Sequence, residues 1–63
     1  MASEISDREL LAAIQNKLDI RGPTFAFAIK AMVRQYVTHA PSDDARKIPQ
    51  QKRAAFLERL GSL

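Results

Sequence analysis

The apolar residues between positions 25 and 37 recur at steps of three and four, which places them on one face of an α-helix. They are Phe25, Ile29, Met32, Val33, Tyr36 and Val37. The polar residues Lys30, Arg34 and Thr38 fall on the opposite side, as a half-buried helix requires. Gly22-Pro23 is typical of a helix start, and Pro41 limits the other end. The pattern predicts a helix over 23–39 that forms the apolar centre of the chain.

Phe27 departs from this pattern, because it lies among the polar positions of the same helix. Alanines at 26, 28 and 31 fill the remaining directions, so the first two turns are apolar nearly all round. Such a segment either packs between two other elements or exposes its ring to a partner. Two arrangements therefore remain open, in which the last helix of the chain or a second chain covers Phe27.

An earlier helix begins after Ser6, which forms a capping box with Glu9 three residues later. Ile5 and Leu10 stand where a hydrophobic staple would fix the entry of the chain. The apolar stripe that follows consists of Leu10, Leu11, Ile14 and Leu18. We expect a helix over 7–18, joined to the next by a short connection that makes an antiparallel hairpin with Ile20 buried under the turn.

The C-terminal third predicts a short turn over 43–48 and a last helix over 50–60. Ser42 is the expected cap of the turn, and Asp43 and Asp44 in its first residues suit the helix dipole. Pro49 is expected at the first position of the last helix, and Gly61 as its C-terminal stop. The apolar stripe of that helix docks on the second helix and consists of Phe56, Leu57 and Leu60.

These elements predict an all-α fold, a small bundle of three main helices with an N-terminal helical hairpin and a short extra turn before the last helix. We expect one domain over 1–63, with 1–5 and 61–63 frayed. Chains this small usually need disulfides, metal or self-association, and this one has no Cys. Homo-oligomerisation is therefore expected. The predicted core consists of Leu11, Ile14, Leu18, Phe25, Ile29, Met32, Val33, Tyr36, Phe56, Leu57 and Leu60.

Composition agrees with a folded globule, at 46% hydrophobic and 27% charged residues. The first residues carry no basic region and no apolar run of signal-peptide length. The longest apolar run, 25–29, is far shorter than the roughly 20 residues of a membrane-spanning helix. We therefore expect a cytoplasmic protein without a membrane partner.

Residues suited to catalysis are sparse, with one His, no Cys and scattered carboxylates. His39, expected at the C-terminal end of the second helix, suits an interaction with the last carbonyls. Asp43 and Asp44 lack a third ligand at metal-binding spacing, so we interpret them as capping residues. The sequence predicts a protein that is not an enzyme, with no catalytic, cofactor-binding or metal-binding residues.

The chain is basic overall, with a formal net charge of +3, and its C-terminal segment is the most basic part. A helix-turn-helix interpretation fails, because the helix after Gly22 opens with the apolar run FAFAI where a recognition helix shows polar side chains. A looser alternative is a small basic regulatory protein that contacts nucleic-acid phosphates without reading sequence. Its contact residues would be Arg46, Lys47, Lys52, Arg53 and Arg59.

The leading hypothesis is a non-enzymatic helical interaction module. It would act as a homodimer, or as an adaptor or regulator that binds a larger protein through an apolar helical face. Small alanines allow another helix to approach closely, and exposed aromatic residues anchor interfaces. The predicted contacts are Phe27, Ala31, Phe56 and Leu60.

Overall fold

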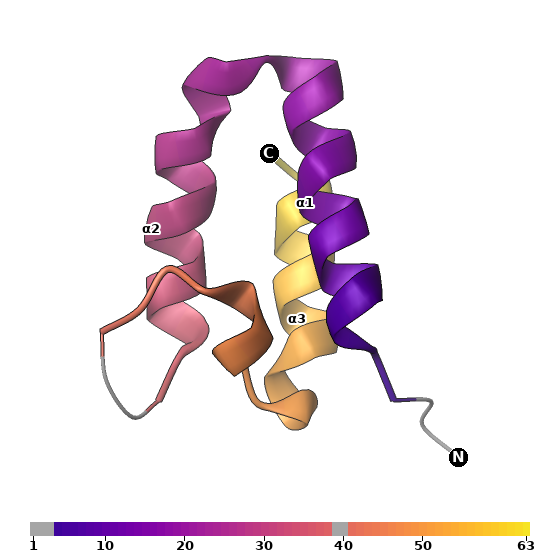
Figure 1. Ribbon diagram of the computed structural model, residues 1–63, viewed down its shortest axis with the longest axis vertical. Helices are drawn as coiled ribbons and strands as arrows, with labels where there is room; N and C mark the ends of the chain where they lie inside the picture. Colours follow the sequence, from indigo (N-terminus) through magenta and orange to yellow (C-terminus); the bar gives the residue numbers. More distant parts are fainter. Residues whose placement is uncertain (1–3, 39–40) are drawn as a thin grey trace.

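The computed structural model describes residues 4–38 and 41–63. Within them the chain forms three α-helices, α1 (Asp7–Arg21), α2 (Ala26–Tyr36) and α3 (Gln50–Gly61), and no strand. Two short 3-10 turns, η1 (Pro23–Phe25) and η2 (Ala45–Lys47), complete the described elements. Helices α1 and α2 run antiparallel, joined at one end by η1, with α3 behind them and η2 in front (Figure 1). The predicted all-α fold is confirmed, and none of the described helices could cross a membrane.

Helix α1 starts at the predicted place, because the Glu9 N–H donates to Ser6 Oγ at 3.1 Å. It continues three residues past the predicted end, to Arg21, until Gly22 stops it with a φ of +96° that few other residues adopt. The Gly22 N–H donates to the Leu18 carbonyl at 2.7 Å. The predicted burial of Ile20 is wrong, since the longer helix turns this side chain away from the core and leaves it 67% exposed.

Helix α2 is shorter than the predicted 23–39. Its first turn is the 3-10 turn η1, and it ends at Tyr36, after which Val37 is extended with φ −87° and ψ 131°. The β-branched residues Val37 and Thr38 favour this extended conformation. His39 lies outside the described residues, so its predicted role at the helix end stays a prediction.

The short turn lies inside the predicted range 43–48, but its cap is Asp44 and not Ser42. The Asp44 carboxylate accepts the Arg46 N–H at 3.0 Å, while Ser42 Oγ accepts the Asp44 N–H at 3.1 Å. Helix α3 covers the predicted 50–60 and one residue more. Pro49 is its extended N-cap, where we had expected a first helical residue.

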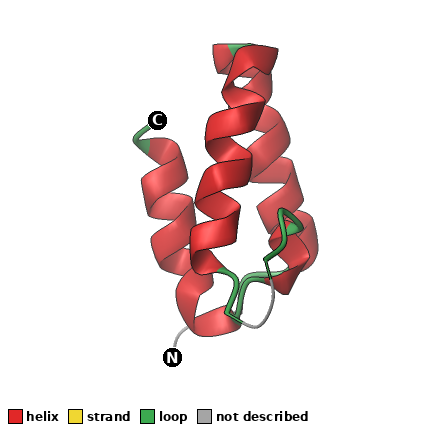
Figure 2. Cartoon of the chain, turned by 90° about the vertical axis from the view of Figure 1, so that its left-hand side faces the viewer, coloured by secondary structure: helices red, strands yellow, loops and turns green. Residues whose placement is uncertain are grey.

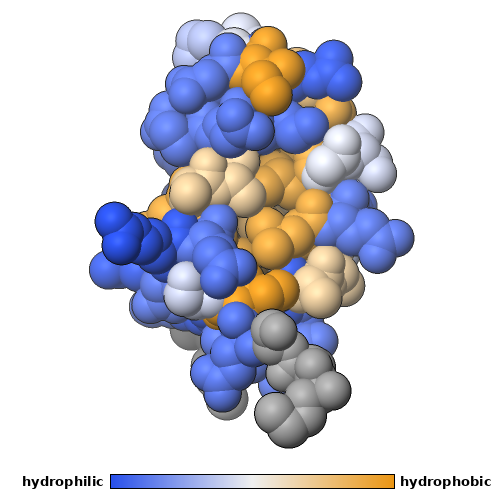
Figure 3. Space-filling model, turned by 90° about the vertical axis from the view of Figure 1, so that its right-hand side faces the viewer, coloured by the Kyte–Doolittle hydropathy of each residue, from blue (hydrophilic) through white to orange (hydrophobic). Residues whose placement is uncertain are grey.

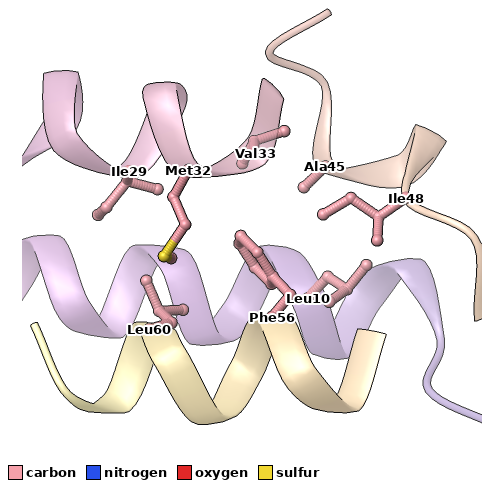
Figure 4. Packing of buried hydrophobic residues seen from close by; sticks show 8 residues of the cluster. All are labelled: Leu10, Ile29, Met32, Val33, Ala45, Ile48, Phe56 and Leu60. Atoms are coloured by element: carbon pink, nitrogen blue, oxygen red, sulfur yellow. The ribbon is translucent and has the colours of Figure 1, made fainter. Parts of the chain in front are cut away.

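Phe56 lies at the centre of the core, with no exposed surface (Figure 4). Its ring centroid lies 5.7 Å from that of Tyr36, and the two ring planes are inclined at 77°, an edge-to-face arrangement. Helix α1 contributes Leu10 to this core. The predicted place of Leu11 is wrong, because this side chain is 46% exposed. The buried hydrophobic residues are Leu10, Ile29, Met32, Val33, Ala45, Ile48, Phe56 and Leu60. Of the remaining predicted core residues, Ile14, Leu18, Phe25, Tyr36 and Leu57 are half-buried against this cluster.

Ala45 of η2 and Ile48, the residue directly after it, belong to the core, although the predicted core did not include them. Ala45 and Ile48 are 3% and 1% exposed. They are buried because η2 packs on α1. The short turn therefore covers the core together with the three helices.

Candidate functional site

The outer face of α2, which we define as Phe27, Ala28 and Ala31, points away from the core. Phe27 is 86% exposed, and both alanines are exposed. Four residues of helix rotate a side chain by about 400°, so Phe27 and Ala31 share one side, while Ile29 and Val33 point inward. Figure 2 views the molecule from the side on which α2 lies. Helix α3 packs on the inner side of α2, so the arrangement in which the last helix covers Phe27 is wrong.

Cations border the outer face of α2 along one edge. Lys30 and Arg34 are exposed, one and two turns beyond Phe27, and α2 contains no acidic residue. Arg34 Nη2 lies 3.9 Å from the Asp43 carboxylate, with both side chains about half exposed. A pair at this distance and exposure contributes little to stability. The outer face is thus an apolar strip with a positive margin.

Two residues that the sequence assigned to the interface lie elsewhere. Phe56 and Leu60 are 0% and 2% exposed and belong to the core. Their stripe is the one that docks α3 against α1 and α2, so neither side chain can reach a partner without opening the bundle. The candidate surface therefore keeps Phe27 and Ala31 and loses Phe56 and Leu60.

A groove that the sequence analysis missed runs between α1 and α2. Its volume is about 190 Å³, and η2 lies at one end of it. Its apolar walls are formed by Leu11, Ile14 and Leu18 of α1 and by Ala26, Ile29 and Val33 of α2. Lys30, Asp43 and Asp44 line its margin. The signal in the sequence was the pair of adjacent leucines at 10 and 11, since one faces the core and the other the groove.

A second hollow of about 300 Å³ lies between α1 and α3. Ala13, Lys17 and Leu57 line it, and the Lys17 ammonium donates to the Gly61 and Leu63 carbonyls at 3.3 and 3.4 Å. Figure 3 shows the molecule from the side of α1, where apolar atoms gather along the middle between hydrophilic margins. Lys17 ties the end of α3 to α1, which gives this hollow a structural role.

Arg53, one of the five cations assigned to phosphate contact, is 6% exposed and structural. Its Nε donates to the Ile48 carbonyl at 2.8 Å, and Nη2 donates to the Arg46 carbonyl at 2.9 Å. Nη1 donates to the Ile5 carbonyl at 2.8 Å and lies 2.9 Å from the Asp7 carboxylate. The guanidinium thus joins α3, η2 and the start of α1. The prediction that Arg53 meets a phosphate is corrected, because the side chain is buried and each of its three nitrogens already has a partner in this chain.

The other four cations of this segment differ in their surroundings. Arg46 forms a two-bond pair with the Asp44 carboxylate at 2.9 and 3.0 Å, which lowers the pKa of Asp44 and raises that of Arg46. Arg59 donates to the Gln35 amide oxygen at 2.9 Å. Lys47 is exposed and Lys52 half-buried, and neither forms an ion pair among the described residues. Only some of the five cations in the C-terminal segment are therefore able to contact phosphates.

Within residues 4–38 and 41–63, no group of three or more His, Asp or Glu side chains is placed to hold a metal ion. No protein family model, no curated protein and no solved structure matches this chain. The candidate sites therefore stand on the exposed surfaces themselves: the outer face of α2, the α1–α2 groove and the exposed cations.

Proposed function

We propose that this protein is a non-enzymatic helical interaction module that binds an apolar helix of a larger protein through the outer face of α2. The observation that carries the proposal is the 86% exposure of Phe27 in a chain whose core is already closed without it. Burying a Phe side chain is favourable by about 1.5–3 kcal/mol. This ring contributes nothing of that kind to the fold, so the free energy is available for binding.

The neighbours of Phe27 favour a helix as the bound element. Ala28 and Ala31 are small and exposed, so a second helix can approach α2 closely. Lys30 and Arg34 border the strip without an acidic residue on α2. The partner helix is therefore expected to be apolar in its middle and to carry Asp or Glu along the edge that meets these cations.

The experiment compares three purified baits, the wild-type chain, Phe27→Ala and Ile20→Ala, for the proteins they retain. Ile20 is a matched control, because it is also a large exposed hydrophobic residue, 67% exposed, on a different helix. A protein retained by wild type and Ile20→Ala but lost from Phe27→Ala is then purified and titrated. We expect Phe27→Ala to weaken its binding about 10- to 100-fold, as 1.5–3 kcal/mol implies. Equal binding by all three baits would contradict the proposal.

The nucleic-acid alternative is less well supported. Arg53 is buried, and Arg46 is exposed but paired with Asp44, which leaves Lys47, Lys52 and Arg59 as the cations that form no ion pair among the described residues. Sequence-independent binding scales with the number of phosphates neutralised. Fewer free cations than the sequence suggested therefore weaken this alternative, and a salt titration tests it.

A further inference from the structure

Two segments outside the three long helices cover the end of the bundle where α3 begins (Figure 1). One is the N-terminal segment, which we define as residues 4–7, and its Ile5 side chain packs against the core. The other is η2, which is followed by the buried Ile48. Among the described residues, no hydrogen bond or ion pair joins these two segments directly. Polar coupling between them must therefore pass through α3.

Arg53 of α3 bonds to both segments. Its Nε and Nη2 donate to the carbonyls of Ile48 and Arg46, at 2.8 and 2.9 Å. Its Nη1 donates to the Ile5 carbonyl at 2.8 Å and lies 2.9 Å from the Asp7 carboxylate. The acceptors of this 6% exposed cation are thus divided between η2 and the N-terminal segment, and its counter-ion comes from the latter.

This division makes the departure of one segment unfavourable for the other. If the N-terminal segment leaves, Arg53 loses its counter-ion and one acceptor while it is still buried. A buried cation without a counter-ion is costly, so the guanidinium turns toward water. The carbonyls of Ile48 and Arg46 then lose their donor, which loosens η2. Departure of η2 has the converse effect, because it removes two acceptors from the same side chain.

We infer that the N-terminal segment and η2 open and close as one unit, with Arg53 as the side chain that couples them. Asp44 and Ala45 also line the α1–α2 groove, so the opening removes one end of its wall. A molecule that draws the N-terminal segment away from α3 would therefore also reshape the groove. The coupling is independent of the proposed function, because Phe27 belongs to neither segment.

Hydrogen exchange of single backbone amides, measured by NMR on the full chain, tests the coupling. The Ile5 amide reports on the N-terminal segment, and the Lys47 and Ile48 amides report on η2. The Val33 amide, inside α2, reports on global unfolding. In wild type we expect the first three to exchange faster than Val33 and with a weaker dependence on urea, because a local opening exposes less surface.

Gln50→Ala loosens the N-terminal segment without touching η2. It removes both bonds between the Gln50 side chain and Ile5 and leaves the partners of Arg53 in place. We expect the Lys47 and Ile48 amides to exchange about 5- to 10-fold faster, as the loss of two exposed hydrogen bonds implies. The Gly22 amide, at the far end of α1, should stay within about 2-fold of wild type.

Asp44→Ala gives the reverse test, because coupling between two equilibria is reciprocal. It removes the cap of η2, whose carboxylate accepts the Arg46 N–H, and touches no residue of the N-terminal segment. We expect the Ile5 amide to exchange about 5-fold faster, as the loss of a cap implies.

Asp7→Asn and Glu9→Gln form a matched pair that tests the role of Arg53. Both acids lie exposed in the first turn of α1, and each substitution removes one negative charge there. Among the described residues, Asp7 pairs with Arg53 and Glu9 does not. Asp7→Asn should speed exchange of the Ile48 amide about 10-fold, because a charged hydrogen bond is weakened, while Glu9→Gln should change it by about 2-fold or less.

Three results would overturn the inference. In the first, Gln50→Ala speeds the Ile5 amide alone, so the two segments open independently. In the second, the Ile48 and Val33 amides of wild type exchange at one rate with one urea dependence, so η2 opens only by global unfolding. In the third, Asp7→Asn and Glu9→Gln have equal effects, so the charge acts through the dipole of α1 and not through Arg53.

Discussion

Arg53 donates from Nη1 to the carbonyl oxygen of Ile5 at 2.8 Å, although 48 residues separate the two in the chain. The side chain of Gln50 adds two more bonds to the same residue, accepting the Ile5 N–H at 3.0 Å and donating to its carbonyl at 2.7 Å. Both backbone polar groups of Ile5 are thus satisfied by α3. The sequence predicts that residues 1–5 fray, whereas hydrogen bonds hold Ile5, the last of them, against the start of α3.

Replacing this buried cation should cost much of the stability of so small a domain. Arg53→Met removes the donor to three backbone carbonyls and leaves the Asp7 carboxylate unpaired. We expect a loss of about 3–5 kcal/mol, chiefly because three backbone carbonyls lose a charged hydrogen-bond donor. Arg53→Lys should restore little of this stability, because one ammonium group cannot donate to three carbonyls that lie in different directions.

Urea unfolding followed by circular dichroism measures both variants. Arg59→Met is the control on the same helix, because Arg59 is exposed and, among the described residues, donates to Gln35 alone. It should change stability by about 0.5 kcal/mol or less, as for most surface substitutions. If Arg53→Met behaved like this control, the guanidinium would not hold the N-terminal segment.

Phe27 and Phe56 are the same residue type in opposite surroundings, with 86% and 0% of the side chain exposed. Phe27→Glu should therefore leave the free energy of unfolding within about 0.5 kcal/mol of wild type. Phe56→Ala should lower it by about 3–5 kcal/mol, because it leaves a cavity in the core. Thermal and urea unfolding of the two variants compare them directly, and a large loss in Phe27→Glu would mean that the ring is covered within the chain.

Acid should weaken the turn η2 through Asp44. The bonds from Arg46 hold the pKa of Asp44 below its ordinary value of 3.8. A carboxyl with a lowered folded pKa stabilises the fold above that ordinary value and loses the contribution as the pH falls through the folded pKa. Between pH 5 and pH 2, wild type should lose more stability than Asp44→Asn, which lacks this titration. Parallel stability profiles for the two proteins, from urea midpoints at each pH, would be inconsistent with the pair.

The fold was largely predictable from the sequence because local signals agreed with one another. The capping box at Ser6, the Gly22-Pro23 break and the period of 25–37 each fix an element boundary or face. The polar role of Arg53 was not predictable, since three of its acceptors are backbone carbonyls that only the folded chain brings together. The same holds for Leu10 and Leu11, because helical periodicity alone cannot tell which edge of a wide stripe meets the core.

The candidate surface was predictable only in part. Phe27 stood out because it broke the helical pattern, and the structure leaves it exposed. The sequence also places Phe56 and Leu60 in this interface. The reason is that an apolar stripe has the same sequence pattern whether it packs on another chain or on the core of its own chain. The groove depends on the angle at which α1 and α2 separate, which periodicity does not determine.

Nucleic-acid binding has a quantitative limit set by the burial of Arg53. At most four cations of the C-terminal segment can meet phosphates, so the slope of log K against log salt should be no steeper than about −3.6 on duplex DNA, at about −0.9 per phosphate. Lys52→Glu together with Arg59→Glu should abolish any such binding and leave the fold intact, because neither residue is buried. Fluorescence anisotropy over a salt series measures the slope. A steeper slope would require cations outside these four, such as Lys30 and Arg34 of α2 or the buried Arg53.

Site-specific photo-cross-linking at position 27 in living cells tests the proposed function most directly. A benzophenone amino acid replaces Phe27 in one protein and Ile20 in the control, since both positions are exposed and lie on different helices. We predict that the position 27 protein forms an adduct of defined mass with a larger protein, whose purified form binds wild type and loses affinity for Phe27→Ala. No adduct at position 27 beyond that at position 20 would contradict the account.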